Sequence, residues 1–518
     1  MSNGNDTVNT SNGNGNGATE TWLILRRLGI DTFQEPVVFM RADCHVCRAE
    51  GFAAQSRVRV IVGERSIIAT LNVVIGDLLA KHQAGVSEAA WRALGAEEGD
   101  VVHVEHMEPL ESFSHVRAKV YGHALNSGQL NAIIHDISEN RYSSVEMAAF
   151  ITACADERMS IDEILSLTTA MVDAGSRLSW PHDIVVDKHC VGGLPGNRTT
   201  PIVVAIVAAC GLIIPKTSSR AITSPAGTAD TMETLTEVSL SLDDMRRVVG
   251  REGGCIVWGG SMNLSPADDI LIRVERPLDF DSEGQMVASV LSKKLSAGST
   301  HLVVDIPVGP TAKVRSAVMA DSLALRLTQV GSALGLTVRV RQTDGTQPIG
   351  RGIGPSLEAL DVLAVLQNHP AAPADLAEHA LRLAADVLEL GGKSAAGDGM
   401  RLAREVLRDG RAWRKFQAIC EAQGGLREPP SAKHHRVFVA RTAGIISSID
   451  SRRLSRIAKL AGAPGTMAAG LELHVQLQQA VEADQPLFTL HAGTPGELAY
   501  AANYANSRED VIRVEPQS

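Results

Sequence analysis

Lys188 and His189 precede a pair of glycines, Gly192 and Gly193, in the segment from Asp187 to Pro201. Glycine-rich turns expose backbone N–H groups, and a helix that starts behind them adds the positive end of its dipole, so the segment is typical of an anion site. Lys188 contributes charge, and His189 contributes a donor that titrates near neutral pH. The spacing matches neither the dinucleotide fingerprint nor the P-loop. A tight turn without a ligand is the alternative interpretation.

Hydroxyl side chains are concentrated in a second segment, from Pro215 to Asp230, which also carries Arg220. This composition suits an oxyanion or a sugar. The segment follows the next predicted strand–helix unit, and ligand sites of α/β sheets gather at the carboxyl ends of strands. We therefore expect the two segments to converge on one crevice, with a Ser/Thr-rich surface loop as the alternative.

A third segment runs from Arg273 to Asp281 and continues to Ser289 and the Lys293-Lys294 pair. Ser289 and Lys293 are one helical turn apart, so they share a helix face. A solvated helix surface is the alternative interpretation of this segment by itself.

The elements that position these segments follow from hydrophobic periodicity. We expect a multidomain α/β protein, in which a helical domain and a mixed or parallel-sheet α/β phosphate-binding domain are flanked by a small β-rich N-terminal domain and a C-terminal α+β domain. The boundaries are a disordered tail at 1–20, the β-rich domain at 21–112, the helical domain at 113–182 joined by about 262–298, the α/β domain at 183–428 and the C-terminal domain at 429–518.

Several individual elements are predicted from the same pattern. One buried helix is expected over the apolar run Ile202–Ile214, and an Ala/Leu-rich helical stretch over 371–407. Strands are expected at 58–62, 67–74, 100–104, 184–186, 255–258, 302–306, 336–340, 437–439, 444–449, 471–475 and 486–490.

Composition excludes several classes of protein. The formal net charge of −10 gives no general field that attracts nucleic acid, because such binding needs clustered Lys and Arg. No apolar run reaches the length that a bilayer crossing needs, and the Asn/Gly/Ser/Thr-rich start has no signal-peptide pattern. Seven cysteines, an odd and sparse set, fit a reducing compartment. We expect a cytoplasmic protein with neither a nucleic-acid nor a membrane partner.

Cys44 and Cys47 form a CxxC sequence that has three interpretations. Half of a zinc site would need a second ligand pair, which is missing. A redox site would need the CxxC to open a helix after a strand, whereas basic and small residues follow it here. Two ordinary cysteines in a β-rich domain is the favoured interpretation.

Together and in this order, the three segments resemble the thymidine/pyrimidine-nucleoside phosphorylase family. Where that family has KHSTGG-like, SGRG…TGGT-like and SILSKK-like sequences, this chain reads KHCVGG, SSRAITSPAGT and SVLSKK. The AGTAD and RVERPLDFD stretches and the N-terminal domain are still more similar to the branch that contains the archaeal AMP phosphorylases and bacterial relatives labelled putative thymidine phosphorylases. The resemblance extends from about Arg117 to the C-terminus and, in that branch, includes the N-terminal domain.

The resemblance implies a set of site residues. Phosphate ligands would be Lys188, Ser218 and Thr228, with Gly192 and Gly193 beside them. Base recognition would use Arg273, Ser289 and Lys293. Nucleotide contacts in the AMP phosphorylase branch would be Gly193, Ser219, Arg220, Ala221, Ile222, Thr223, Ser224, Thr228, Ser289 and Lys313. The proton donor would be Asp281, with His189 as the alternative.

Two departures separate this chain from the simple deoxynucleoside enzymes. Cys190 and Val191 replace a Ser-Thr pair of the first loop, and the second loop carries Ala221, Thr223, Ser224 and Pro225 in place of a Gly/His-containing turn.

The function that the resemblance implies is conversion of thymidine and phosphate to thymine and 2-deoxy-α-D-ribose 1-phosphate. It also implies no cofactor or metal, with inorganic phosphate as co-substrate, and a homodimer or larger homo-oligomer whose two main domains close about hinges near Trp180 and Leu264. One alternative is a nucleoside 5′-monophosphate phosphorylase that yields ribose 1,5-bisphosphate, with Arg198, Arg220 and Lys313 as candidates for the second phosphate. Another is an inactive nucleotide-binding protein.

Overall fold

The computed structural model describes residues 22–32, 35–155, 158–221, 224–278, 282–508 and 510–516. The tail expected at 1–20 lies outside these ranges. The chain divides into two compact units, one of residues 1–111 with 139–143 and one of residues 112–138 with 144–518. Within the described residues, no helix is both long enough and apolar enough to cross a membrane.

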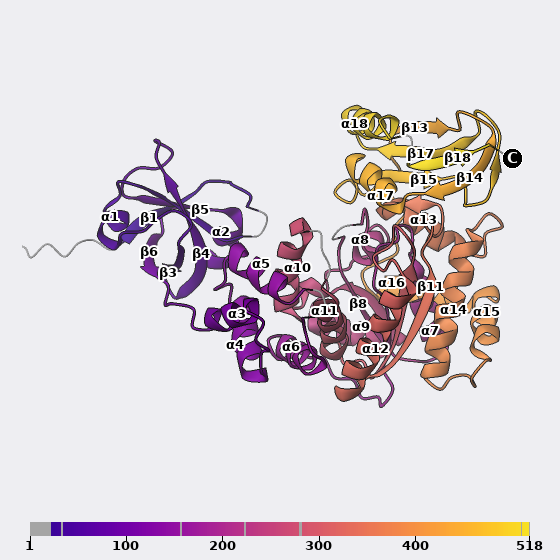
Figure 1. Ribbon diagram of the computed structural model, residues 1–518, viewed down its shortest axis with the longest axis horizontal. Coiled ribbons are helices and arrows are strands. Elements are labelled where there is room, and N and C mark those ends of the chain that lie inside the picture. Colours follow the sequence, from indigo (N-terminus) through magenta and orange to yellow (C-terminus); the bar gives the residue numbers. More distant parts are fainter. Residues whose placement is uncertain are drawn as a thin grey trace, which may run out of the picture. The chain divides into compact units, whose positions relative to one another are not determined.

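Six strands of the first unit close into a barrel in the order β1-β5-β2-β4-β3-β6 (Figure 1). The strands are β1 (Trp22–Arg27), β2 (Val37–Arg41), β3 (Arg57–Val62), β4 (Arg65–Val74), β5 (Gln83–Val86) and β6 (Val101–His106). Alternation sets which side chains enter the core, since Val58 and Val60 are fully buried and Arg59 between them is exposed. The strands predicted at 58–62, 67–74 and 100–104 are confirmed as β3, β4 and β6.

Cys44 and Cys47 open the short helix α1 (His45–Glu50), which follows β2. The Cys44 sulfur accepts a hydrogen bond from the Cys47 N–H at 3.1 Å and so caps the helix. Hydrogen bonding from Cys47 lowers the pKa of the Cys44 thiol to about 6. The expectation that this CxxC does not open a helix after a strand is wrong, because Cys44 itself supplies the cap. Both thiols are free and buried.

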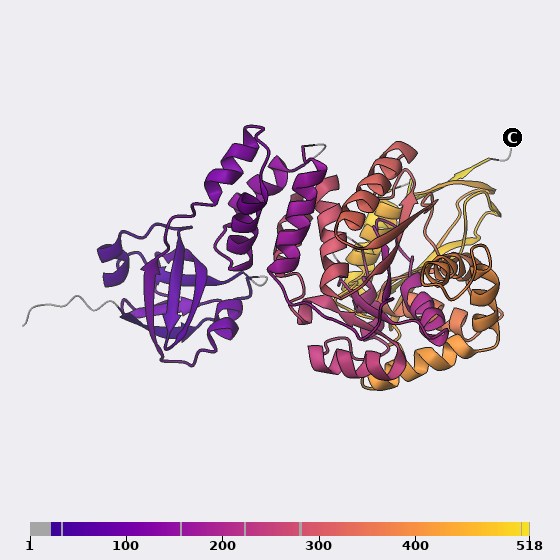
Figure 2. The same ribbon diagram turned by 90° about the horizontal axis from the view of Figure 1, so that it is seen from below.

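The helical part of the second unit contains two segments of the chain. Its helices are α3 (Phe113–Val120), α4 (Ser127–Ser138), α5 (Ser144–Ala153), α6 (Ile161–Asp173), α10 (Pro266–Leu278) and α11 (Glu283–Ser296). Helix α11 packs against α6, and α10 packs against α4 and α5, so the pink helices lie beside the purple ones in Figure 2. In α4, Ile133, Ile134 and Ile137 are fully buried, as the three- and four-residue spacing predicts.

Parallel strands form the central sheet of the second unit. The strands are β7 (Val186–Cys190), β8 (Ile214–Ser218), β9 (Gly254–Trp258), β10 (His301–Val308) and β11 (Thr337–Asp344). A parallel bridge between Val185 and Ile213 joins the set β11-β10-β7 to the pair β8-β9. The resulting order is β11-β10-β7-β8-β9, with β7 in the centre.

Two of the elements predicted near the centre of the sheet have wrong boundaries. The run Ile202–Ile214 is not one helix, because α7 (Thr199–Ala209) closes before Gly211, whose φ of 76° is left-handed, and Ile214 starts β8. The strand predicted at 184–186 begins only at Val186, and pairing with β10 extends it to Cys190.

Helices cover both faces of this sheet. They are α9 (Leu242–Glu252), α12 (Ala317–Ala333), α13 (Pro355–Leu366), α14 (Ala374–Leu390), α15 (Gly399–Arg408) and α16 (Arg411–Ala422), together with α7. Val186, Ile214 and Ile256 point to one face and share a core with α7, α14 and α16, whereas Cys255 and Val257 point to the other and pack on α9. Figure 1 shows α7, α14 and α15 side by side. The helical stretch predicted at 371–407 is confirmed as α14 and α15.

The C-terminal segment forms two antiparallel sheets, β12-β15-β17-β13 and β16-β14-β18. Their elements are β12 (Gly352–Ile353), β13 (His434–Val439), β14 (Gly444–Ile449), β15 (Gly470–Leu473), β16 (Ala480–Val481), β17 (Pro486–Ala492) and β18 (Ile512–Glu515), with α17 (Ser451–Leu460) and α18 (Pro495–Asn506). Strand β12 comes from the α/β segment and pairs with β15. The C-terminal sheet is thereby tied to the loop that precedes α13.

Candidate active site

The carboxyl ends of β7 and β10 meet at the centre of the sheet, where the chain leaves the two strands in opposite directions. Strand β7 continues through α7 to β8 on one side, and β10 continues through α12 to β11 on the other. In open α/β sheets, ligands bind in the crevice that such a reversal leaves. Lys188 and His189 lie on β7 at this edge.

Gly192 and Gly193 turn the chain away from β7 with left-handed φ values of 90° and 83°. A Cβ on Gly193 would stand 2.3 Å from the backbone nitrogen of Lys313, which follows β10. Only glycine allows this approach, so the loop after β7 and the loop after β10 touch at two residues that the resemblance had implicated separately.

Lys188 is 1% exposed, and its ammonium group donates a hydrogen bond to the Thr199 hydroxyl at 2.8 Å. Thr199 is the first residue of α7, where backbone N–H groups lack helical partners. The same hydroxyl is 3.4 Å from the Asn197 side-chain oxygen. Lys188 is thereby held at a helix N-terminus, beside two polar side chains that sequence analysis did not single out.

A buried cluster of charges lies beneath this loop. Asp187 is fully buried and pairs with Lys294 at 2.8 Å and with Lys216 at 3.6 Å. Lys216 and Lys294 are themselves at most 4% exposed. Burial pushes the pKa of Lys216 well below its usual value, although Asp187 opposes this shift. Asp187 is thereby flanked by two buried amino groups, while the third, that of Lys188, donates to Thr199, and its charge acts on the buried carboxylate of Asp305.

The field of this cluster acts on His189. Burial and then the charges of Lys294, Lys216, Lys293 and Lys188 lower the pKa of His189 well below 6.5. The imidazole is therefore neutral at pH 7, and any anion that enters the cluster would raise this pKa.

The second predicted segment begins at the end of β8. The Ser218 hydroxyl is buried and has no hydrogen-bond partner among the described residues, at the edge where a ligand would bind. Thr228 starts the next short helix, α8 (Thr228–Glu233), and its hydroxyl accepts a hydrogen bond from Arg198 at 2.8 Å. Arg198 also pairs with Glu358 of α13 and donates to the Ala226 carbonyl.

The remaining residues of this segment mainly build the loop. Arg220 pairs with Glu233 and Asp230 and lies over the Trp258 ring, 4.8 Å from its centroid. The Ala221 N–H donates to Asp230 at 2.6 Å, and the Ser224 hydroxyl donates to the Ala226 carbonyl. Ser219 is exposed. Ile222 and Thr223 lie outside the described residues.

The third segment places its candidates on α10 and α11. Lys293 pairs with Asp268 of α10 at 2.6 Å and donates to the Ser289 hydroxyl at 3.2 Å, so the predicted shared face is confirmed. Arg273 lies on α10. The Lys294–Asp187 ion pair fixes α11 against β7, which brings this face toward the first loop. Asp281 lies outside the described residues.

Sequence analysis missed Asp187, Thr199, Lys216, Lys294 and Asp268 as members of the site. The KHC and SKK sequences flag only Lys188 and Lys293, whereas the other residues acquire their significance through contacts between distant strands and helices. No group of three or more His, Cys, Asp or Glu side chains in the described ranges could hold a metal ion.

The fold and the site define a class of proteins in which a helical bundle and a parallel α/β sheet frame a glycine-rich loop with buried lysines beside it. Residues 114–175 match the helical bundle domain of the glycosyl transferase family, and residues 182–413 match the a/b domain of that family. Residues 445–509 match the pyrimidine nucleoside phosphorylase C-terminal domain.

Relatives of the chain cover nearly its whole length. It is 64% identical to the "Putative thymidine phosphorylase" of Polaromonas sp. strain JS666 over 95% of this chain and 96% of that protein. It is 63% identical to "Putative thymidine phosphorylase 2" of Acidovorax sp. strain JS42, over 94% and 95% of the two chains. It is 56% identical to the "Putative thymidine phosphorylase" of Hahella chejuensis, over 96% of this chain and 98% of that protein. The chain belongs to the thymidine/pyrimidine-nucleoside phosphorylase family.

Proposed function

We propose that this protein is a pentosyltransferase that cleaves a pyrimidine nucleoside with inorganic phosphate, and that thymidine is its substrate. The products would be thymine and 2-deoxy-α-D-ribose 1-phosphate. The observation that carries the proposal is the excess of buried amino groups beneath a glycine-rich loop. The family and the names of its relatives support the class of base and of reaction.

The charge balance favours phosphate as the anion. Lys216 and Lys294 share the carboxylate of Asp187, and Lys188 and His379 act on the carboxylate of Asp305, so three buried amino groups meet two buried carboxylates. Burying amino groups without matching anions is costly, so a dianion in the crevice would offset the desolvation of the cluster. The Ser218 hydroxyl and the N-terminus of α7 would supply hydrogen bonds to its oxygens.

In the reaction, a phosphate oxygen forms a bond to C1′ while the bond from C1′ to the base nitrogen breaks. The electron pair of that bond goes to the base, which takes up a proton. Lys293, Ser289 and Arg273 would bind the base, where negative charge develops. A neutral His189 can donate a hydrogen bond but is not a ready acid, so we assign the proton to Asp281.

The geometry does not favour a nucleoside 5′-monophosphate. A second phosphate would need free cationic donors, yet two of the three candidates are ion-paired, Arg198 with Glu358 and Arg220 with Glu233 and Asp230. Freeing either guanidinium would leave a carboxylate partner unpaired.

The test is release of free base from thymidine, uridine, CMP and AMP, each with and without inorganic phosphate. Phosphate-dependent release of thymine supports the proposal. Release from uridine but not thymidine keeps the reaction and overturns the choice of substrate. Cleavage of monophosphates alone, or no cleavage of any of the four, overturns the proposed function.

A further inference from the structure

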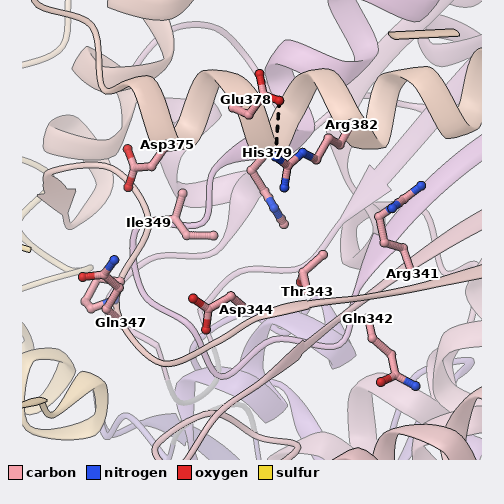
Figure 3. A pocket seen from close by; sticks show the side chains of 11 residues that line it. Arg341, Gln342, Thr343, Asp344, Gln347, Ile349, Asp375, Glu378, His379 and Arg382 are labelled. Carbon is pink, nitrogen blue, oxygen red and sulfur yellow. Dashed lines mark ion pairs between the residues drawn. The ribbon is translucent and has the colours of Figure 1, made fainter. Parts of the chain in front are cut away.

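A cavity of about 400 Å³ lies between the end of β11 and α14, behind the phosphate loop. His379 and Arg382 project into it from α14, and Thr343 and Asp344 line the opposite wall (Figure 3). From α14, the His379 ring also contacts Asp305 on β10, so this side chain connects the cavity to the interior of the sheet.

Asp305 is fully buried, and besides the Cys190 thiol its carboxylate has three side-chain partners from other elements. It lies 3.1 Å from the His379 Nε2, accepts from the Thr343 hydroxyl at 2.6 Å and lies 3.4 Å from the Asn197 side-chain nitrogen. Burial pushes the pKa of Asp305 upward, but the His379 hydrogen bond and the Lys188 charge outweigh it and hold the pKa well below its usual value. Because an ionised carboxylate only accepts, the Nε2 of His379 carries the hydrogen.

Asn197 connects this carboxylate to the phosphate loop. Its nitrogen faces Asp305, and its oxygen faces the Thr199 hydroxyl. Thr199 in turn accepts from the Lys188 ammonium at 2.8 Å. An unbroken series of polar contacts therefore runs from the cavity wall to the amino group that would hold phosphate.

We propose that His379 and Asp305 are positioning residues, which orient Asn197 and through it the Thr199 hydroxyl and the Lys188 ammonium toward phosphate. This inference rests on the proposed function. Without the His379 donor, the Asp305 carboxylate loses a hydrogen bond and attracts more strongly the Asn197 side-chain nitrogen and the Lys188 ammonium, whose charge acts on it. Phosphate binding is then weakened, while the base side of the site on α10 and α11 is untouched.

The test compares His379→Leu, which removes the donor, with His379→Gln, whose side-chain nitrogen can take the place of Nε2. The expected result for His379→Leu is a phosphate KM raised roughly ten- to hundredfold, the loss associated with a hydrogen bond to a charged group. The nucleoside KM should change less than about twofold, and His379→Gln should recover most of the phosphate affinity.

Arg382→Leu is the matched control, because Arg382 lines the same cavity from the same helix and pairs only with Glu378 among the contacts described for it. It should leave the phosphate KM at the wild-type value. Equal loss in both leucine variants, or a parallel rise of both KM values in His379→Leu, would overturn the positioning role.

Calorimetric titration with inorganic phosphate separates this inference from the proposed reaction. A wild-type protein that binds phosphate without cleaving any nucleoside overturns the reaction, and the variants then test the network by affinity alone. Unchanged phosphate affinity in a folded His379→Leu protein overturns the network even if wild-type turnover is confirmed. A wild-type protein that does not bind phosphate overturns both.

Discussion

At the scale of single residues, the main feature of the site is a set of buried, desolvated amino groups. Lys216 and Lys294 pair with Asp187, and burial together with the charges of these lysines and of Lys188 keeps the pKa of His189 low and its ring neutral. Such an arrangement is costly in the empty protein and becomes favourable when an anion enters. An anion bound beside the cluster would therefore favour proton uptake by its neighbours.

Lys188→Ala should lose most phosphate-dependent turnover, roughly a hundredfold to a thousandfold in kcat/KM for phosphate, because it removes an electrostatic contact to the reacting anion. Steady-state kinetics at varied phosphate concentration checks this. Lys433→Ala is the control, because Lys433 is exposed in the C-terminal segment. Near-wild-type kinetics in Lys188→Ala would refute the phosphate site.

His189→Asn should change how stability depends on pH. The folded pKa of His189 lies below 6.5, so the unfolded state binds more protons as the pH falls through 6.5, and the native protein loses stability there. The wild-type free energy of unfolding should fall between pH 7 and 5 more steeply than that of the variant, by up to about 1.4 kcal/mol per pH unit. Denaturant titrations in phosphate-free buffer measure the difference.

Saturating phosphate should shrink that difference, because the anion raises the pKa of His189 toward its unfolded value. If the free energy of unfolding depends on pH equally in wild type and variant without phosphate, the pKa of His189 is not lowered in the folded protein.

At the scale of elements, the contact between the loops after β7 and β10 defines the crevice. Gly192 and Gly193 share a left-handed conformation, but only Gly193 is pressed against a neighbouring backbone. A substitution at Gly192 therefore measures the cost of backbone strain alone. A substitution at Gly193 adds the cost of a collision with the opposite loop.

Gly192→Ala should cost about 1 to 2 kcal/mol of stability from its φ alone, with phosphate affinity largely kept. Gly193→Ala should cost more and should also weaken phosphate binding, because its Cβ would lie 2.3 Å from the Lys313 nitrogen and push the loops apart. Thermal unfolding and phosphate titration of the two variants provide the measurement. Indistinguishable phosphate affinities would contradict the loop contact.

Sequence patterns predicted three of the five strands of the sheet, β9, β10 and β11, because β-branched runs such as Leu302–Ile306 and Cys255–Trp258 have few other interpretations. They failed where one apolar run, Ile202–Ile214, contains the end of a helix and the start of a strand. They also failed at Cys44, where a cysteine takes the place of the usual helix-capping residue. In the site, Lys188 and Lys293 were visible from motifs. Asp305 and His379 were not, because their roles exist only once β10 and α14 lie against the loop after β7.

At the scale of the whole molecule, three connections between the helical part and the α/β part of the second unit run side by side. The Ser176 N–H donates to the Asn263 carbonyl, the Leu178 N–H donates to the Ser296 carbonyl, and the Trp180 ring N–H donates to the Ala297 carbonyl at 2.8 Å. These three hydrogen bonds tie the connections to one another at the boundary between the two parts. The positions near Trp180 and Leu264 stay predicted hinges.

Addition of phosphate together with nucleoside should close the two parts and lower the radius of gyration in small-angle scattering. Phosphate alone should have less effect, because its proposed ligands Lys188, Ser218 and Thr228 all lie in the α/β part. Scattering profiles that are identical with and without both ligands would count against the hinge.

The central place of β7 in the sheet has a consequence for synthesis of the chain. Strand β7 leaves the ribosome well before β10, although β10 is its neighbour, and the Val185 N–H bonds the Thr300 side chain, 115 residues further along the sequence. Until that later segment emerges, one edge of β7 is unpaired, and Asp187 and Lys188 lack Lys294 and Asp305. Loop closure over such a distance makes late pairing slow. During synthesis, more than a hundred further residues are therefore added while this edge of β7 stays unpaired. The charged residues of the strand help to keep it soluble during that time.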